Sequence, residues 1–175
     1  MADFGLVVWI TGLAGSGKTT LGRLVYDELK PKLPNLVYLD GDELRDVFGQ
    51  NGYDRESRLE ISKKRAALCA LLASQKINVI VTSIAMFDEI YLHNRKSIPD
   101  YLEIYVKCDL EELYRRDQKQ LYSKARAKEI SNVVGVDIPF DEPKNADLII
   151  DNSLLGNLAE KRDEILELIK TQGVA

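Results

Sequence analysis

The chain has 175 residues, of which 45% are hydrophobic and 30% are charged, an ordinary composition for a globular protein. It carries 24 basic and 28 acidic residues, so its net charge of -4 gives no electrostatic reason to expect DNA or RNA as a partner. The start of the chain lacks the layout of a signal peptide, and no apolar stretch approaches the ~20 residues of a membrane span. Two cysteines are too few for a disulfide framework, so we expect a cytoplasmic protein without a membrane partner. The length fits one domain over residues 1–175.

Apolar runs of strand length alternate with longer helical patterns along the chain. Strands are predicted at residues 6–10, 36–39, 78–82, 101–107 and 148–150. Helices are predicted at residues 19–30, 56–75, 88–97, 110–118 and 158–170. The segment 119–143 is polar and irregular and is a candidate lid. This alternation indicates a three-layer α/β domain whose parallel sheet is covered on both faces.

Residues 12–19, with the sequence GLAGSGKT, match the phosphate-binding pattern G-x-x-x-x-G-K-[ST] between a predicted strand and a predicted helix. Glycines let the N–H groups of such a loop point at phosphate oxygens, and the helix dipole adds positive charge. Lys18 is expected to reach the β- and γ-phosphates of ATP, and the Thr19 hydroxyl to ligate Mg²⁺. The expected ATP-binding residues are Gly12, Ala14, Gly15, Ser16, Gly17, Lys18, Thr19 and Thr20.

A phosphate loop alone does not distinguish a kinase from a GTPase switch or an ATP-driven motor. The chain has no [NT]-K-x-D motif for guanine, and its third predicted strand runs into Thr82-Ser83-Ile84 without the acidic pair of a motor. The small size and the basic residues at the start of the candidate lid favour a compact kinase. A nucleotide-sensing module that binds ATP without turnover is the alternative, and ADP formation separates the two.

The second predicted strand ends in Asp40-Gly41-Asp42, at the strand end where parallel α/β sheets bind ligands. A carboxylate there can accept a proton from an attacking hydroxyl or hold water on Mg²⁺. Arg45 lies one helical turn past Asp42, where it can pair with an anionic acceptor. We therefore expect Lys18, Asp42 and Arg45 to be catalytic and Asp40 to join Thr19 at the metal. The alternative is a solvated acidic turn with Asp42 as a helix N-cap.

Several segments together resemble the adenylylsulfate (APS) kinase family, in order, with matching gaps and over nearly the whole chain. They are GLAGSGKTT at 12–20, LDGDELR at 39–45, GYDRESRLE at 52–60, RDQKQLYSKARAKEI at 116–130 and GVDIPF at 135–140. The resemblance implies a P-loop kinase fold with strand order 2-3-1-4-5, and ATP with Mg²⁺ as the donor. It also implies a homodimer, and a small-molecule acceptor that presents a ribose 3′-hydroxyl and a modified 5′-diphosphate.

Carried over residue by residue, the resemblance implies that Asp42 deprotonates the 3′-hydroxyl while Arg45 and Arg58 bind the anionic 5′ end. Tyr53 stands where the family uses Phe to stack on the acceptor base. The lid is implied to carry three basic residues that close over the phosphates, namely Lys119, Lys124 and Arg126. The implied substrate-binding residues are Asp42, Arg45, Tyr53, Arg58, Ile61, Ile84, Ala85, Lys119 and Val133.

Four departures from the family pattern bear on the acceptor. Ile61 replaces an Asn, Ala85 replaces a Ser, and Val133 replaces the second Phe of the base clamp. In the lid, Gln118-Lys119-Gln120 replaces Pro-Lys-Gly. Two acceptors therefore stay open: APS itself, and cytidine 5′-diphosphoramidate, whose smaller pyrimidine would suit a pocket with one ring fewer.

Two groups of residues are assigned no role in the site. Lys63, Lys64 and Arg65 are expected on the solvated face of the helix at 56–75, with the alternative that one of them reaches a phosphate. His93, the only histidine, is expected away from the motif loops.

Overall fold

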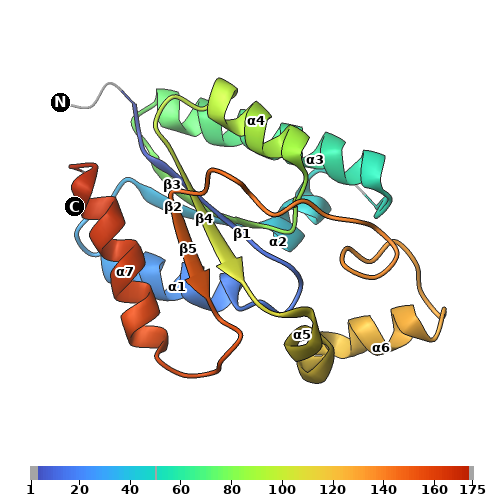
Figure 1. The fold of residues 1–175 in the computed structure, drawn as a ribbon. Helices are drawn as coiled ribbons and strands as arrows, with labels where there is room; N and C mark the ends of the chain where they lie inside the picture. The colour runs from blue at the N-terminus through green and yellow to red at the C-terminus, as the bar shows by residue number, and fades with distance from the viewer. Residues whose placement is uncertain (1–3, 50, 174–175) are drawn as a thin grey trace.

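The computed structural model describes residues 4–49 and 51–173. Within them, five parallel strands form a sheet in the order β2-β3-β1-β4-β5 (Figure 1). The strands are β1 (Val7–Thr11), β2 (Leu36–Asp40), β3 (Asn78–Ser83), β4 (Tyr101–Lys107) and β5 (Leu148–Asp151). This is the strand order that the family resemblance implied, and each strand lies within one residue of its predicted bounds.

The helices cover both faces of the sheet, as the alternating pattern predicted. Their bounds are α1 (Lys18–Leu29), α2 (Gly41–Val47), α3 (Arg55–Ser74), α4 (Asp88–Ser97), α5 (Leu110–Arg116), the 3₁₀ helix η1 (Gln118–Gln120), α6 (Leu121–Arg126) and α7 (Leu158–Thr171). Helices α3 and α4 pack on one face, and α1 and α7 pack on the other (Figure 1). No helix in the described parts of the chain is both long and apolar enough to cross a membrane.

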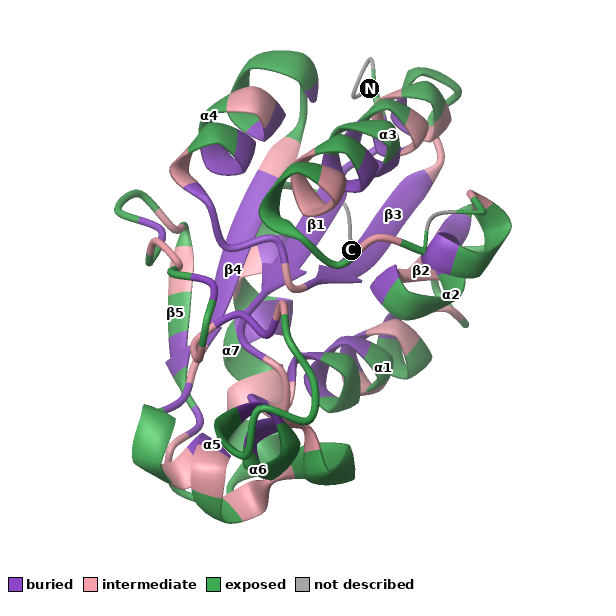
Figure 2. Ribbon diagram, turned by 90° about the vertical axis from the view of Figure 1, so that its right-hand side faces the viewer, coloured by how far each residue is buried: buried purple, intermediate pink, exposed green. Residues whose placement is uncertain are grey.

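The central strand β1 shows why its sequence is a continuous apolar run. Val7 and Trp9 pack into the cluster beneath α3 and α4, whereas Val8 and Ile10 pack into the cluster beneath α1 and α7. Successive side chains of a strand point to opposite faces, so a strand covered on both sides has no solvent-facing position. Figure 2 shows this burial running through the inner strands, while the outer surfaces of the helices are exposed.

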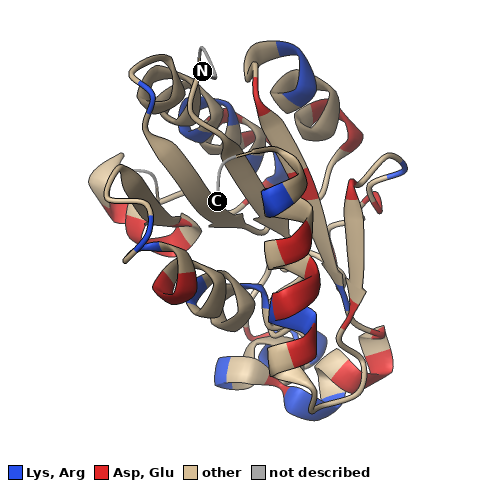
Figure 3. Ribbon diagram, turned by 90° about the vertical axis from the view of Figure 1, so that its left-hand side faces the viewer, with Lys and Arg blue, Asp and Glu red and all other residues tan. Residues whose placement is uncertain are grey.

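Charged residues lie mainly on the outside of these layers. Figure 3 shows acidic and basic residues interspersed along α7, rather than gathered into one basic stripe. This mixture agrees with the small net charge of the whole chain.

The candidate lid at 119–143 is more regular than its sequence predicted, because it contains the end of η1 and the whole of α6. The Asp117 carboxylate begins α6 by accepting the N–H groups of Tyr122 and Ser123, both at 3.0 Å. The Tyr122 hydroxyl then donates to the Ala14 carbonyl oxygen at 2.7 Å, which ties α6 to the phosphate loop. The expectation of an irregular segment was wrong at residues 121–126, because the Asp117 side chain, rather than helical periodicity, begins α6.

Gln120 has a left-handed backbone with φ of 58°, and it stands where the resembling family has Gly. A side chain in this conformation costs roughly 1–2 kcal/mol, so Gln120→Gly should raise the free energy of unfolding by roughly 1 kcal/mol. Urea denaturation measures the change. The matched control is Lys124→Gly within α6, which should lower the free energy of unfolding by about 1 kcal/mol. Destabilisation by both substitutions would contradict a strained Gln120.

Candidate active site

A cavity of about 1170 Å³ opens at the carboxyl ends of β1, β2 and β3. Most residues that the sequence assigned to the site line it: Ala14, Gly15, Gly17, Lys18, Thr19, Thr20, Asp40, Asp42, Arg45, Tyr53, Arg58, Ile61, Ile84, Ala85, Lys119 and Val133. Four others do not line it, namely Gly12, Ser16, Lys124 and Arg126. Ser16 is a buried residue of the loop itself, and the Arg126 guanidinium stacks 5.2 Å from the centre of the Tyr114 ring. Lys119 is thus the predicted lid cation that this structure brings to the cavity.

The phosphate loop joins β1 to α1 in the way its motif predicts. Gly15 and Gly17 have left-handed φ angles of 79° and 98°, which a residue with a side chain adopts only with strain. The Lys18 side chain folds back into this loop, where its Nζ donates to the Leu13 carbonyl oxygen at 3.3 Å. Burial lowers the pKa of Lys18 to about 8, and the negative charges of Asp42 and Asp40 oppose this shift. The ammonium group is therefore buried, and these two carboxylates offset its charge only in part.

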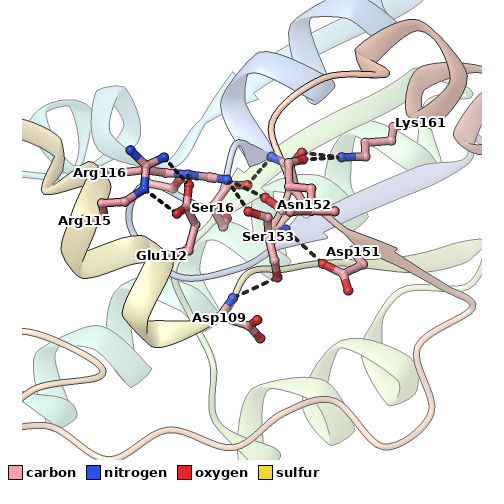
Figure 4. Close-up of polar contacts among 11 residues, drawn as sticks. Ser16, Asp109, Glu112, Arg115, Arg116, Asp151, Asn152, Ser153 and Lys161 are labelled. Carbon is pink, nitrogen blue, oxygen red and sulfur yellow. Dashed lines mark hydrogen bonds and ion pairs between the residues drawn. The ribbon is translucent and has the colours of Figure 1, made fainter.

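Two side chains from distant parts of the chain support the loop from outside (Figure 4). The Asn152 amide donates to the Ser16 carbonyl oxygen at 2.7 Å, and the Arg116 guanidinium donates to the Gly15 carbonyl oxygen at 3.2 Å. Arg116 also donates to the Asn152 carbonyl oxygen at 2.6 Å, and Lys161 donates to the Asn152 side chain at 2.8 Å. These contacts fix the loop at two carbonyl oxygens, whereas phosphate binding uses N–H groups.

Sequence reasoning missed both supporting residues. The signal for Asn152 was positional, since it directly follows the last strand and so lies at the ligand-binding edge of a parallel sheet. Arg116, at the end of α5, had no comparable signal.

The acidic turn after β2 is built around Asp40 rather than Asp42. Asp40 is the N-cap of α2, because its Oδ1 accepts the N–H of Asp42 at 2.9 Å. The alternative in which Asp42 caps this helix was therefore wrong. Asp42 lies in the first turn of α2 and lines the cavity. Across residues 4–49 and 51–173, its carboxylate has no hydrogen-bond or ion-pair partner, so it is available to a ligand.

Two predicted arginines surround Tyr53 at one end of the cavity. The Arg45 guanidinium lies 4.4 Å from the centre of the Tyr53 ring, and the Arg58 guanidinium lies 5.5 Å from it. Backbone carbonyl oxygens hold both, with Arg45 donating to Gly52 and Arg58 donating to Tyr53, each at 2.7 Å. Burial, followed by the nearby charge of Arg45, lowers the pKa of Arg58 to about 10. Tyr53 stays 52% exposed, so its ring can still contact a ligand.

The wall beyond these arginines is apolar. Ile61 is 1% exposed and Val133 is 4% exposed, and Ala85 is buried beside them in the cavity lining. Asp137 shapes the loop that carries Val133, because its carboxylate accepts the N–H groups of Asn132 and Val133, both at 2.6 Å. This end of the cavity thus combines cationic side chains with a wall that offers no side-chain hydrogen bonds at positions 61, 85 and 133.

Arg65 lies in the cavity wall, which corrects the expectation that it shares a solvated face with Lys63 and Lys64. It is 3% exposed and lines the cavity, whereas the two lysines are exposed. The reason is helical geometry, because Ile61, Arg65 and Cys69 are each four residues apart and therefore lie on the same, buried face of α3. The charge run at 63–65 obscured this spacing.

The burial of Lys18 leads to a prediction about stability and pH. Its folded-state pKa of about 8 lies below the ordinary 10.5, so protonated Lys18 destabilises the ligand-free fold, and this cost disappears as the pH rises from 8 to 10.5. Lys18→Met should therefore raise the free energy of unfolding at pH 7 by on the order of 1–3 kcal/mol. Urea denaturation should show this gain shrinking above pH 8. The control is Lys63→Met, on the exposed face of α3, for which we expect no pH-dependent gain in the free energy of unfolding. A gain in Lys18→Met that stays the same from pH 7 to pH 10.5 would contradict the role of the buried charge.

Comparison with known proteins identifies the family. The model of the adenylylsulphate kinase family matches residues 4–151. A cytidine diphosphoramidate kinase of Campylobacter jejuni is 55% identical over 161 residues, which cover 92% of this chain and 94% of that protein. A probable adenylyl-sulfate kinase of Aeropyrum pernix is 38% identical over 152 residues, covering 84% and 83% of the two chains.

A solved structure of similar shape agrees with this. The APS kinase of Mycobacterium tuberculosis, solved in complex with AMPPNP and APS, superposes with a TM-score of 0.87 at 34% identity, over 97% of this chain and 99% of that one. The matched length, the phosphate loop and the shared strand order all lead to one assignment. The chain belongs to the adenylylsulfate kinase family and is an ATP-dependent nucleotide kinase.

Proposed function

We propose that this kinase transfers the γ-phosphoryl group of ATP to the ribose 3′-hydroxyl of cytidine 5′-diphosphoramidate. The observation that carries the proposal is the apolar wall at the acceptor end, where buried Ile61 and Val133 stand in place of the Asn and Phe of the family pattern. The identity of 55% to a cytidine diphosphoramidate kinase, against 38% to an adenylyl-sulfate kinase, supports the same acceptor.

The physical argument concerns the acceptor base. Stacking on one aromatic side chain contributes about 1–3 kcal/mol per base, so a clamp with Tyr53 and Val133 holds a purine less tightly than a clamp with two rings. Ile61 cannot replace the hydrogen bonds of an Asn, and a polar group of the base facing it would lose its partners. A pyrimidine has a smaller ring to cover, and Tyr53 can stack on it alone.

The proposed mechanism is an in-line transfer in which positioning and charge neutralisation supply most of the catalysis. Lys18 binds the β- and γ-phosphates, while Arg45 and Arg58 hold the anionic 5′ end of the acceptor. The 3′-oxygen forms its bond to the γ-phosphorus as the bond from that phosphorus to the β,γ-bridging oxygen breaks, which releases ADP. The proton of the 3′-hydroxyl passes to the Asp42 carboxylate.

We further propose that Mg²⁺ accompanies ATP, with the Thr19 hydroxyl and the Asp40 carboxylate next to it. Among the described residues, no cluster of three or more His, Cys, Asp or Glu could hold a metal ion by itself. That fits Mg²⁺, which usually keeps several waters and binds through few protein oxygens together with the substrate phosphates. When bound, it would neutralise charge on the transferred group.

Four broader proposals come from the composition and layout of the sequence and, for the lid and the homodimer, from the family resemblance. We propose that residues 1–175 act as one kinase domain, that residues 119–143 close over the phosphates as a lid, and that the protein works in the cytoplasm as a homodimer. The position of Lys119 in the cavity lining supports the lid. The free, buried thiols of Cys69 and Cys108 are compatible with a reducing compartment.

The choice of acceptor is tested by measuring ADP release with ATP and each candidate. We expect kcat/KM for cytidine 5′-diphosphoramidate to exceed that for APS by at least about tenfold, the effect of one missing stacking contact. The double variant Ile61→Asn/Val133→Phe should narrow this ratio by restoring the purine clamp. Equal or faster turnover of APS by the wild-type protein would contradict the proposed acceptor. If no ADP forms with either acceptor, the result would favour the alternative of a module that binds nucleotide without turnover.

The role of Asp42 is tested by Asp42→Asn, which keeps the size of the side chain but removes the proton acceptor. We expect kcat to fall by about 10²–10⁴-fold, the usual contribution of a general base, while the KM for ATP stays within about twofold. Glu43→Gln is the matched control, because Glu43 is the adjacent acidic residue and pairs with Arg23 at 3.6 Å. An unchanged kcat in Asp42→Asn would show that another group takes the proton.

A further inference from the structure

The peptide group between Gly41 and Asp42 is held from both sides. Its N–H donates to Asp40 Oδ1 at 2.9 Å, and its carbonyl oxygen accepts from Arg65 Nη2 at 3.0 Å. Both partners are charged side chains, which make stronger hydrogen bonds than neutral groups do. The orientation of the peptide that carries the Asp42 side chain is therefore defined by Asp40 on one side and Arg65 on the other.

Both of these side chains are in turn attached to the end of β3. Asp40 Oδ2 accepts from the Thr82 hydroxyl at 3.2 Å, and Arg65 Nη1 donates to the Ser83 hydroxyl at 2.6 Å. Thr82 and Ser83 are the last two residues of β3, so their side chains point to opposite faces of the sheet. The Gly41–Asp42 peptide is thus connected to β3 from both faces.

Gly41 brings this turn directly against the strand. A Cβ atom at Gly41 would lie 2.6 Å from the Thr82 carbonyl oxygen and 3.4 Å from Arg65 Nη2. No side chain fits at this position, so the backbone of the turn lies directly against the backbone of β3. The Arg65 guanidinium packs against the same glycine.

The stability of the fold does not explain a charged residue here. Arg65 is 3% exposed, its Nε has no hydrogen-bond partner, and within the described residues no carboxylate lies at ion-pair distance from it. A buried charge without a counter-ion usually costs more free energy than an apolar side chain of the same size. Burial, followed by the charge of Arg45, lowers the pKa of Arg65 to about 10, so the guanidinium stays charged at neutral pH.

We propose that Arg65 is a positioning residue for phosphoryl transfer, because it holds the Gly41–Asp42 peptide against β3 and thereby places the Asp42 carboxylate opposite the phosphate loop. This inference rests on the proposed function of Asp42 as the proton acceptor. Small displacements of a reacting group are costly, since a misplacement of about 1 Å can slow a reaction about 10²-fold.

The test compares Arg65→Met in the wild-type background and in the Asp42→Asn background. With ATP and cytidine 5′-diphosphoramidate, Arg65→Met should lower kcat by about 10–100-fold, while the KM for ATP stays within about twofold. In the Asp42→Asn background the same substitution should lower kcat by less than about twofold, because residues that act through one group are not additive. Equal losses in both backgrounds would overturn the proposal, since they would indicate a general structural defect.

Two further variants keep the test independent of how well Arg65→Met folds. Ser83→Ala removes one of the two hydrogen bonds of Arg65 without changing any charge, and it should lower kcat several-fold in the wild-type background and not in Asp42→Asn. Arg65→Lys keeps the charge but cannot donate in the planar fork that reaches both Gly41 and Ser83, so it should not restore kcat. Full activity of Arg65→Lys or Ser83→Ala would overturn the proposal.

These outcomes separate the inference from the function on which it rests. A wild-type protein that turns over neither acceptor contradicts the proposed function and the inference together. A wild-type protein that turns over the acceptor, with unchanged kcat in Arg65→Met and Ser83→Ala, overturns the positioning role alone.

Discussion

The parallel register of β2, β3 and β1 is the constraint on which the site depends. Thr11 of β1 is in register with Ser83 of β3, and Asp40 of β2 is in register with Thr82. The three strands therefore end at one level, and the phosphate loop, the acidic turn and the segment after β3 start side by side at the same edge. A slip of one residue would turn every side chain of a strand to the other face, so the close packing of the fully buried strands β1 and β3 protects the geometry of the site.

The cavity gathers cationic side chains whose charge the carboxylates of Asp40 and Asp42 offset only in part. Lys18 and Arg45 are both buried, and neither has an ion-pair partner among the described residues. Burying such groups costs free energy in the ligand-free protein, whereas phosphate groups provide the missing negative charge when they bind. Buried positive charge at the site thus lowers the stability of the fold and raises its affinity for anionic ligands, as is common at functional sites.

The proposed donor and acceptor halves of the cavity differ in how they are built. The donor half is a backbone loop, fixed from outside by Asn152 and Arg116, so its geometry depends little on which side chains line it. The acceptor half is made of side chains from α2, from α3 and the residues just before it, and from the loop that carries Val133, so single substitutions there change what fits. This difference explains how the family pattern can stay intact around ATP while it changes at positions 61, 85 and 133.

The sequence by itself determined the elements and the phosphate loop, because burial on both faces, helical periodicity and a loop motif are local properties of the chain. The family resemblance added the strand order, which the structure bears out. Only the tertiary structure decided the neighbours of these elements: Arg65 beside Gly41, Asn152 against the phosphate loop, and Arg126 away from the cavity. Arg65 and Gly41 are 24 residues apart and Asn152 and Ser16 are 136 apart, so these contacts exist only once the sheet has assembled and no local pattern encodes them.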